Sequence, residues 1–224
     1  MPARRRSNPL ALAVLVCLGE RPMHPYEVAQ TLRTRHKDDS VRLNYGSLYA
    51  VINALGRRKL IEAAETERAG RLPERTIYQI TDAGKVEMHD WLSELVAVPT
   101  KEYPALEAAL SFLPALAPCE AVSLLEERAA RLEAELAGAG ALRELVEKAR
   151  LPRLLWVEAE FAVALRQTEL DFVRRLLADI AGGQLDGLAW WQQIHDDPDG
   201  PVPLPPPWAP GPGNDKANDD SEEA

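Results

Sequence analysis

Residues 44–55 read NYGSLYAVINAL, a helical stretch that begins with polar and aromatic residues and continues with mainly apolar ones. On a helical wheel of residues 46–58, one face carries apolar residues at positions i, i+3, i+4 and i+7: Leu48, Val51, Ile52 and Leu55. The opposite face carries small and polar residues: Gly46, Tyr49, Ala50, Asn53 and Arg57. Small residues allow close approach, and Asn and Arg side chains bind base edges and phosphates. The pattern is typical of a recognition helix in a DNA major groove, although an ordinary amphipathic helix with a solvated face also has it.

The two ends of this helix carry further polar groups. Tyr45 and Ser47 add hydroxyl groups near the N-terminus, where backbone N–H groups already attract anions. Arg57, Arg58 and Lys59 close the helix, and their simplest role is to complement the negative end of its dipole.

The neighbouring segments predict the elements of a winged helix. Residues 9–20 and 25–37 are expected to be helices, and Pro25 occupies a first-turn position where its missing N–H costs nothing. Residues 60–67 and 75–81 have the pattern of two strands. Thr81 or Asp82 then caps another helix. The residues expected to face the core are Leu10, Val14, Leu15, Leu18, Ala29, Leu32, Trp91, Leu92 and Leu95.

The loop between the two strands would be the wing. Arg68, Arg71 and Arg75 bracket this loop, and we expect them to contact the DNA backbone or minor groove. Glutamates in the same hairpin reduce its positive charge, so the expected contribution is modest.

Charge is distributed unevenly along the chain. The net charge is −9, which by itself argues against a nucleic-acid partner. Residues 1–97, however, hold 15 Lys and Arg against 12 Asp and Glu, and Arg4, Arg5 and Arg6 form a basic arm. The remaining residues hold 11 against 23, so the first part is the candidate for binding a polyanion.

The second part of the sequence predicts long helices. After a linker punctuated by Pro99 and Pro104, residues 120–140 carry a heptad seam: Val122, Leu125, Ala129, Leu132 and Leu136. Residues 151–180 form another amphipathic pattern, whose expected buried residues are Val157, Phe161, Leu165, Phe172, Leu176 and Ile180. The fold class is therefore mainly α, with a winged helix-turn-helix in residues 1–98, a coiled-coil-like dimerisation region in residues 99–195 and a Pro-rich, acidic, disordered tail in residues 196–224.

No pattern in the sequence indicates catalysis, a cofactor or a metal. The four histidines are scattered without ligand spacing, and no phosphate-binding loop or catalytic triad is present. No run of about 18 apolar residues predicts a membrane span. The two cysteines, Cys17 and Cys119, are expected to be buried free thiols in a reducing cytoplasm.

Three stretches carry a resemblance to a known family: LALAVLVCLGERPMHPYEVAQTLRTR, NYGSLYAVINALGRRKLIEAAE and RTIYQITDAGKVEMHDWL. Over about residues 9–98 they resemble the PadR family of bacterial transcriptional regulators. The Gly-Ser-Leu-Tyr entrance, the Leu-Ile strand and the Tyr-x-Ile-Thr-x-x-Gly return have that family's order and spacing. The helical region that follows is similar to the dimerisation region of longer members.

The resemblance implies a homodimeric winged-helix protein, usually a repressor, which a small molecule releases from DNA in some members. The residues that would then face DNA are Tyr45, Ser47, Tyr49 and Asn53. A two-fold axis through the long helices would present two winged helices to an inverted-repeat operator. The alternative is that these helices pair only within one chain.

Two further possibilities remain open at the level of sequence. Trp91 and Trp156 could stack a small apolar or aromatic effector, although core packing is the commoner use of such residues. The chain could instead be a winged-helix adaptor that binds a protein partner without sequence-specific DNA binding.

Overall fold

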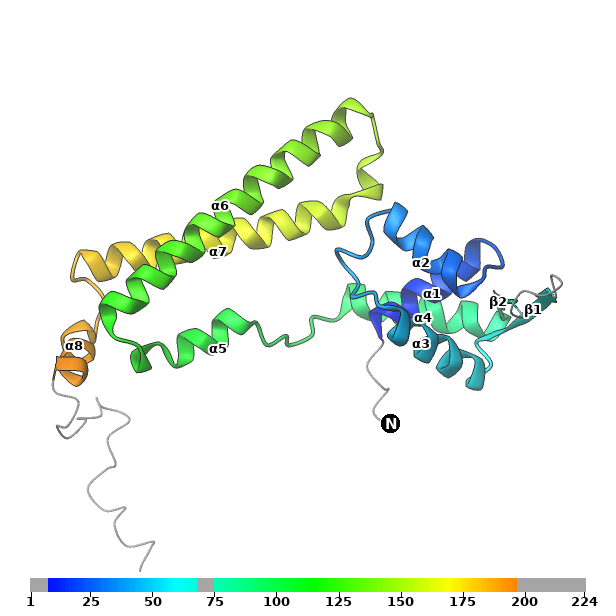
Figure 1. Ribbon diagram of the computed structural model, residues 1–224, viewed down its shortest axis with the longest axis horizontal. Helices are drawn as coiled ribbons and strands as arrows, with labels where there is room; N and C mark the ends of the chain where they lie inside the picture. The colour runs from blue at the N-terminus through cyan, green and yellow to red at the C-terminus, as the bar shows by residue number, and fades with distance from the viewer. Residues whose placement is uncertain (1–7, 68–74, 197–224) are drawn as a thin grey trace, which may run out of the picture. The chain divides into compact units, whose positions relative to one another are not determined.

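The computed structural model describes residues 8–67 and 75–196 (Figure 1). These residues form two compact units that divide between Glu102 and Tyr103, and each unit has its own hydrophobic core. The predicted basic arm and the predicted tail from residue 197 onward lie outside the described residues. The assignment of DNA binding to the first unit and of dimerisation to the second stays a prediction.

The first unit has the element order of a winged helix, so the predicted fold class is confirmed. Its elements are α1 (Pro9–Glu20), α2 (Pro25–Thr34), α3 (Tyr45–Arg57), β1 (Ile61–Glu67), β2 (Arg75–Ile80) and α4 (Asp82–Ala97). Helix α2 ends before the predicted boundary because His36 adopts a φ of 53°, and the N–H of Lys37 donates to the Leu32 carbonyl.

Side-chain caps define where all four of these helices begin, and those of α1, α2 and α4 are as follows. The Asn8 side chain accepts a hydrogen bond from the Leu10 N–H at the start of α1. His24 and Glu27 form a capping box at the start of α2, in which the His24 N–H donates to Glu27 Oε2 at 2.8 Å. Thr81 caps α4 by accepting from the N–H of Gly84.

The core of the first unit lies where α1, α2 and α3 meet. The predicted stripes of α1, α2 and α3 are all buried: Leu10, Val14, Leu15, Leu18, Ala29, Leu32, Leu48, Val51, Ile52 and Leu55. Trp91 of α4 is also buried, as predicted. The prediction was wrong for Leu92 and Leu95, which are exposed because α4 continues past Trp91 without reaching the core again.

The two strands pair antiparallel, with Ile61 opposite Ile80 and an irregularity in register between Ala63 and Glu65. A short bridge attaches this hairpin to the α1–α2 connection, because Met23 and Tyr78 exchange both backbone hydrogen bonds at 3.0 Å. The hairpin is therefore fixed to the helical body through β2, which sets the direction of the two strands (Figure 1).

Gly84 allows the first turn of α4 to pack against the chain that leaves α3. A Cβ atom at this position would lie 2.1 Å from the Leu60 carbonyl oxygen and 2.7 Å from Ile80 Cγ1. No side chain fits at such distances, so the return from β2 into α4 requires glycine for close approach rather than for its backbone torsions.

The second unit is a long helical hairpin with short helices at its base. Its elements are α5 (Ala105–Ser111), η1 (Leu113–Ala115), α6 (Pro118–Lys148), η2 (Arg153–Leu155), α7 (Val157–Ala181) and α8 (Leu188–Asp196). Helices α6 and α7 lie side by side and run in opposite directions (Figure 1). The Trp191 indole N–H donates to the Leu116 carbonyl at 2.8 Å, which fixes α8 beside the start of α6.

The predicted seam of α6 is confirmed. Leu125, Ala129 and Leu132 are buried against α7, and Val122 and Leu136 are partly buried. Three ion pairs join the two helices across this seam: Arg128–Glu169, Arg174–Glu133 and Arg166–Glu135. Among the described residues, no helix has both the length and the apolar character that a membrane span needs.

The predicted burial of α7 was only partly correct. Ile180 is buried and Leu176 is partly buried, but the other four expected core residues are exposed: Val157, Phe161, Leu165 and Phe172. These four residues lie on a different side of α7 from Leu170 and Val173, the buried residues that pack against α6. The fully buried residues of α6 also end at Leu132, so the outer half of the hairpin has no core of its own. Cys17 is buried, and its burial raises the pKa of its thiol. Cys119 is exposed, contrary to the prediction, because it lies in the first turn of α6.

Candidate nucleic-acid interface

Helix α3 presents a polar face to solvent on top of a fully buried apolar stripe. Asn44 begins the helix, since its side-chain oxygen accepts the Ser47 N–H at 2.7 Å. The residues on the side opposite the core are all exposed: Gly46, Ser47, Tyr49, Ala50, Asn53 and Arg57. Helix α3 contains no acidic residue. The face that the sequence predicts for DNA is therefore accessible and carries no negative side chain of its own.

The Asn44 cap changes what the N-terminus of α3 can offer to an anion. The sequence suggested that backbone N–H groups near Ser47 attract phosphate, but the Ser47 N–H is already bound by Asn44 Oδ1. The Leu48 N–H donates to the Asn44 carbonyl. The N–H groups of Tyr45 and Gly46 are the ones left in the first turn. The Ser47 hydroxyl remains exposed beside them.

An aromatic and cationic cluster joins α2 to the start of α3. The rings of Tyr26 and Tyr45 stack with centroids 6.4 Å apart and an interplanar angle of 7°. The guanidinium of Arg33 lies 4.9 Å from the centre of the Tyr45 ring, and its Nη1 donates to the Tyr45 hydroxyl at 2.9 Å. Sequence reasoning identified Tyr45 but missed Tyr26 and Arg33, because their association depends on how α2 crosses α3.

Seven of the basic side chains in the described part of the first unit fall into two groups. Arg21, Arg35 and Arg58 each form an ion pair with a glutamate, namely Glu27, Glu20 and Glu87. Among the described residues, no carboxylate lies within ion-pair distance of the second group, which consists of Arg33, Arg42, Arg57 and Lys59. The second group lies on α3 and beside its two ends, so positive charge without a partner is concentrated around the exposed face of α3.

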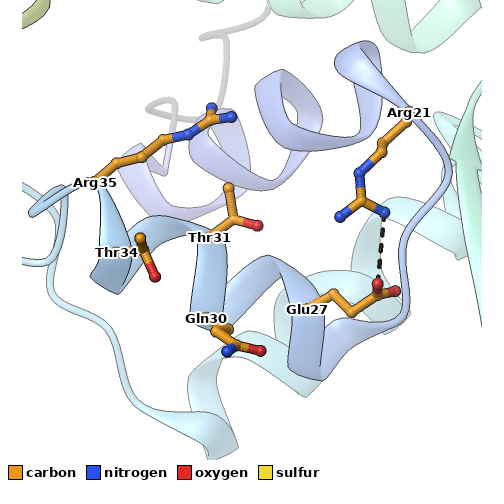
Figure 2. A pocket seen from close by; sticks show the side chains of 6 residues that line it. All are labelled: Arg21, Glu27, Gln30, Thr31, Thr34 and Arg35. Carbon is orange, nitrogen blue, oxygen red and sulfur yellow. Dashed lines mark hydrogen bonds and ion pairs between the residues drawn. The ribbon is translucent and has the colours of Figure 1, made fainter.

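A hollow of about 320 Å³ lies between α2 and the residue that follows α1 (Figure 2). Its lining is polar and consists of Arg21, Glu27, Gln30, Thr31, Thr34 and Arg35. Hydrogen bonds from the His24 backbone to Glu27, and from Arg35 to Glu20, lower the pKa of each carboxyl. Both glutamates therefore remain charged and neutralise the arginines of the hollow, which makes this surface a poor site for an anion.

The structure brings together only part of the predicted site. Tyr45, Ser47, Tyr49, Asn53 and Arg57 lie on the exposed side of α3 or at its start. Arg68 and Arg71 lie outside the described residues. Arg75 begins β2 opposite Glu67 in the backbone register. The DNA-contact roles of all eight residues stay predictions.

The two tryptophans predicted to bind an effector belong to different units. Trp91 is only 6 % exposed and packs in the core of the first unit, with the Arg58 guanidinium 5.2 Å above its ring. Trp156 precedes α7 in the second unit, and its indole N–H is buried without a hydrogen-bond partner among the described residues.

No group of three or more His, Cys, Asp or Glu side chains in the described residues could hold a metal ion.

Comparisons with known proteins agree with this fold. Residues 14–90 match the model of the transcriptional regulator PadR-like family, a family of regulators rather than enzymes. The match spans α1 to most of α4 and includes the whole exposed face of α3. No curated protein matches the chain.

Several solved structures share the fold at low sequence identity. Bacillus subtilis PadR in complex with operator DNA is 20% identical with a TM-score of 0.61, and the alignment covers 76% of this chain and 98% of that one. The same protein in complex with p-coumaric acid is 18% identical with a TM-score of 0.61, covering 75% and 96%. The Vibrio cholerae virulence activator AphA is 18% identical with a TM-score of 0.59, covering 77% and 98%. At these identities the structures establish a shared fold.

Proposed function

Because residues 14–90 match the PadR-like family of transcriptional regulators, we propose that this protein is a homodimeric, sequence-specific DNA-binding repressor that acts in the cytoplasm. The observation that carries the proposal is the exposed face of α3, which has no acidic residue and is held on a fully buried stripe. A recognition helix needs a rigid support, because a small displacement of the helix would break its contacts to base edges.

Helix α3 would enter the major groove with the side that carries Tyr49, Asn53 and Arg57. An asparagine can bind adenine through two hydrogen bonds at N6 and N7, so Asn53 would supply sequence discrimination. Arg57 lies one turn further along the helix and would bind a base edge or a phosphate. The wing arginines Arg68, Arg71 and Arg75 would contact the DNA backbone alongside.

The charge of the first unit supports DNA as the partner. Within the described part of the first unit, the arginines without an ion-pair partner lie on α3 or close to its ends, whereas Arg21 and Arg35 at the ends of α1 and α2 are neutralised by glutamates. Cations that lack protein partners displace counterions from DNA on binding, and this release is the main source of affinity for the backbone.

Dimerisation is supported by the second unit. The exposed residues Val157, Phe161, Leu165 and Phe172 recur along one side of α7, and Leu142 and Leu145 of α6 are also exposed. An exposed apolar stripe of this length is unusual for a monomeric protein and is typical of an interface. A second copy of the chain would cover it, and a two-fold axis would place two α3 helices on an inverted-repeat operator.

A small apolar or aromatic effector would release the repressor from DNA. The Bacillus subtilis PadR structure with p-coumaric acid supports this part of the proposal, because that ligand is a small aromatic acid. Trp156 fits the role better than Trp91: its buried indole N–H lacks a partner, whereas Trp91 belongs to the core. Titration of the purified protein with aromatic acids tests this step, and unchanged indole fluorescence with a ligand that does release DNA would contradict it.

The central experiment is a fluorescence-anisotropy titration of the full chain against DNA from upstream of its own gene, with scrambled DNA as the control, at two salt concentrations. Tight binding that exceeds the control and weakens steeply with salt supports a sequence-specific regulator. Weak and equal binding to both fragments supports the adaptor alternative or an operator elsewhere, and capture of genomic fragments would decide between these. A reporter gene behind the bound fragment then tests repression, since expression should rise when the regulator is deleted.

A further inference from the structure

The cluster of Tyr26, Arg33 and Tyr45 holds a charged group in place without neutralising it. Arg33 of α2 donates to the Tyr45 hydroxyl and lies over the Tyr45 ring, and Tyr26 stacks on the same ring. All three side chains are exposed. The guanidinium is therefore positioned by neutral partners at the N-terminal end of α3.

This arrangement differs from that of Arg21 and Arg35, which follow the last residues of α1 and α2. The carboxylates of Glu27 and Glu20 bind Arg21 and Arg35, which removes their net attraction for an anion. Arg33 has no carboxylate within ion-pair distance among the described residues. A guanidinium has five N–H donors, and the Tyr45 hydroxyl uses one of them. The remaining donors form a planar fork that matches the oxygens of a phosphate.

We propose that Arg33, oriented by Tyr45 and Tyr26, binds a phosphate of the DNA backbone beside the groove that α3 enters. Helix α2 would thereby fix the position of α3 along the DNA, since backbone contacts set register and orientation while base contacts read sequence. Holding the guanidinium in advance lowers the conformational entropy lost on binding. The inference rests on the proposed DNA-binding function and adds a contact that lies outside α3 and the wing.

The test compares two exposed arginines that differ in their partners. Full-length wild type, Arg33→Ala and Arg21→Ala are titrated against the upstream fragment and against scrambled DNA over a series of salt concentrations. Arg33→Ala should weaken binding to both DNAs by a similar factor, roughly tenfold, and should reduce the slope of log affinity against log salt by about one unit. Arg21→Ala should change affinity less than about twofold, because Glu27 already neutralises that side chain.

Two further variants separate the charge from its positioning. Arg33→Lys keeps the charge but not the fork, so the salt slope should be retained while affinity falls. Tyr45→Phe keeps the stacked ring and removes the hydroxyl acceptor, so affinity should fall by a smaller factor with the slope unchanged. If Arg33→Ala loses helix content by circular dichroism, Arg33→Gln replaces it, since that side chain keeps most of the stem.

The outcomes distinguish the inference from the function on which it rests. A wild-type protein that binds no duplex in a salt-dependent way overturns both. A wild type that binds DNA, together with an Arg33→Ala variant that matches Arg21→Ala in affinity and slope, overturns the Arg33 contact alone. A loss of slope confined to the Arg33 variants that lack the charge supports the phosphate contact.

Discussion

In the winged-helix unit the whole apolar stripe of α3 is buried within the chain, whereas in the helical unit most of the predicted stripe of α7 is exposed. The first unit packs α1, α2, α3 and Trp91 of α4 around one centre, so the stripes of α1, α2 and α3 each meet a neighbour. The second unit is a long hairpin in which each helix has one neighbour, and its buried residues are confined to the part nearest α8. The apolar stripe of α3 is thus covered by the chain itself, whereas that of α7 would be covered only in the proposed dimer.

The substitution with the largest expected effect, Gly84→Ala, tests whether the winged-helix unit is closely packed around its own core. A Cβ atom 2.1 Å from the Leu60 carbonyl forces α4 away from the core, so we expect the free energy of unfolding to fall by about 3 kcal/mol. Urea unfolding of the full chain measures the change.

Gly56→Ala is the matched control within α3. A Cβ atom there meets nothing within 4 Å, so the same substitution should stabilise the helix by about 0.5–1 kcal/mol. Equal effects of the two substitutions would show that Gly84 is not a packing requirement.

The second half of the comparison predicts that Phe161→Ser disrupts the dimer. Phe161 is 65 % exposed in the single chain, and burial against a second copy would make it an anchor of the interface. We expect the dimer dissociation constant to rise about 30-fold, or about 2 kcal/mol, as measured by sedimentation velocity over a dilution series.

Val86→Ser serves as the control for this prediction. Val86 of α4 is 63 % exposed and belongs to the unit that buries its own core, so its replacement should leave the oligomeric state unchanged. If the wild type sediments as a monomer, or if both variants dissociate alike, the contrast between the two units is wrong.

The difference between α3 and α7 also shows which buried residues could be predicted from the sequence. Period-3.6 spacing predicted the buried face of α3 correctly because every residue of that stripe meets another part of the same chain. The same spacing on α7 identified Phe161 and Leu165 as apolar positions, but periodicity does not tell whether the neighbour belongs to the same chain or to another. Leu92 and Leu95 were misjudged because α4 continues past Trp91 without reaching the core again.

The part of the candidate site that depends on contacts between helices could not be predicted from the sequence. Asn44, Ser47 and Asn53 lie close together in sequence, so a helical wheel placed them relative to the exposed face. The stacking of Tyr26 on Tyr45 and the position of Arg33 depend on the crossing of α2 and α3, which no local pattern determines. The short helix α5 escaped prediction because Pro99 and Pro104, which precede it, were interpreted as part of a linker.

Sequence discrimination by α3 gives a third prediction. Asn53→Ala should lose about 1–3 kcal/mol of affinity for the operator while binding to scrambled DNA stays the same, since the contact is made to a base. Competition titrations with operator and scrambled DNA measure the ratio of the two affinities. Equal loss on the two DNAs would assign Asn53 to the backbone instead.

A smaller effect is expected at the helix ends, where both units have the same local feature. Lys59 after α3 and Arg150 after α6 have φ values of 58° and 51°, and the residue following each one donates to the carbonyl five positions earlier. Glycine adopts this left-handed conformation without strain, so Lys59→Gly and Arg150→Gly should each stabilise the protein by about 1 kcal/mol. Urea unfolding monitored by circular dichroism tests both. If neither substitution stabilises its unit, contacts of the two side chains compensate for the strain.

The smallest predicted effect concerns the ion pair between α1 and the end of α2. The hydrogen bond from Arg35 lowers the pKa of Glu20, so the stabilisation is present above the unfolded-state pKa of about 4.3 and is lost as the pH falls through the lower folded value. Glu20→Gln should therefore lower the free energy of unfolding at neutral pH, by less than about 1 kcal/mol because both side chains are exposed and screened. The difference in unfolding free energy between wild type and Glu20→Gln should narrow as the pH is lowered past that value. A difference that stays constant with pH would mean that Glu20 acts through packing and not through its charge.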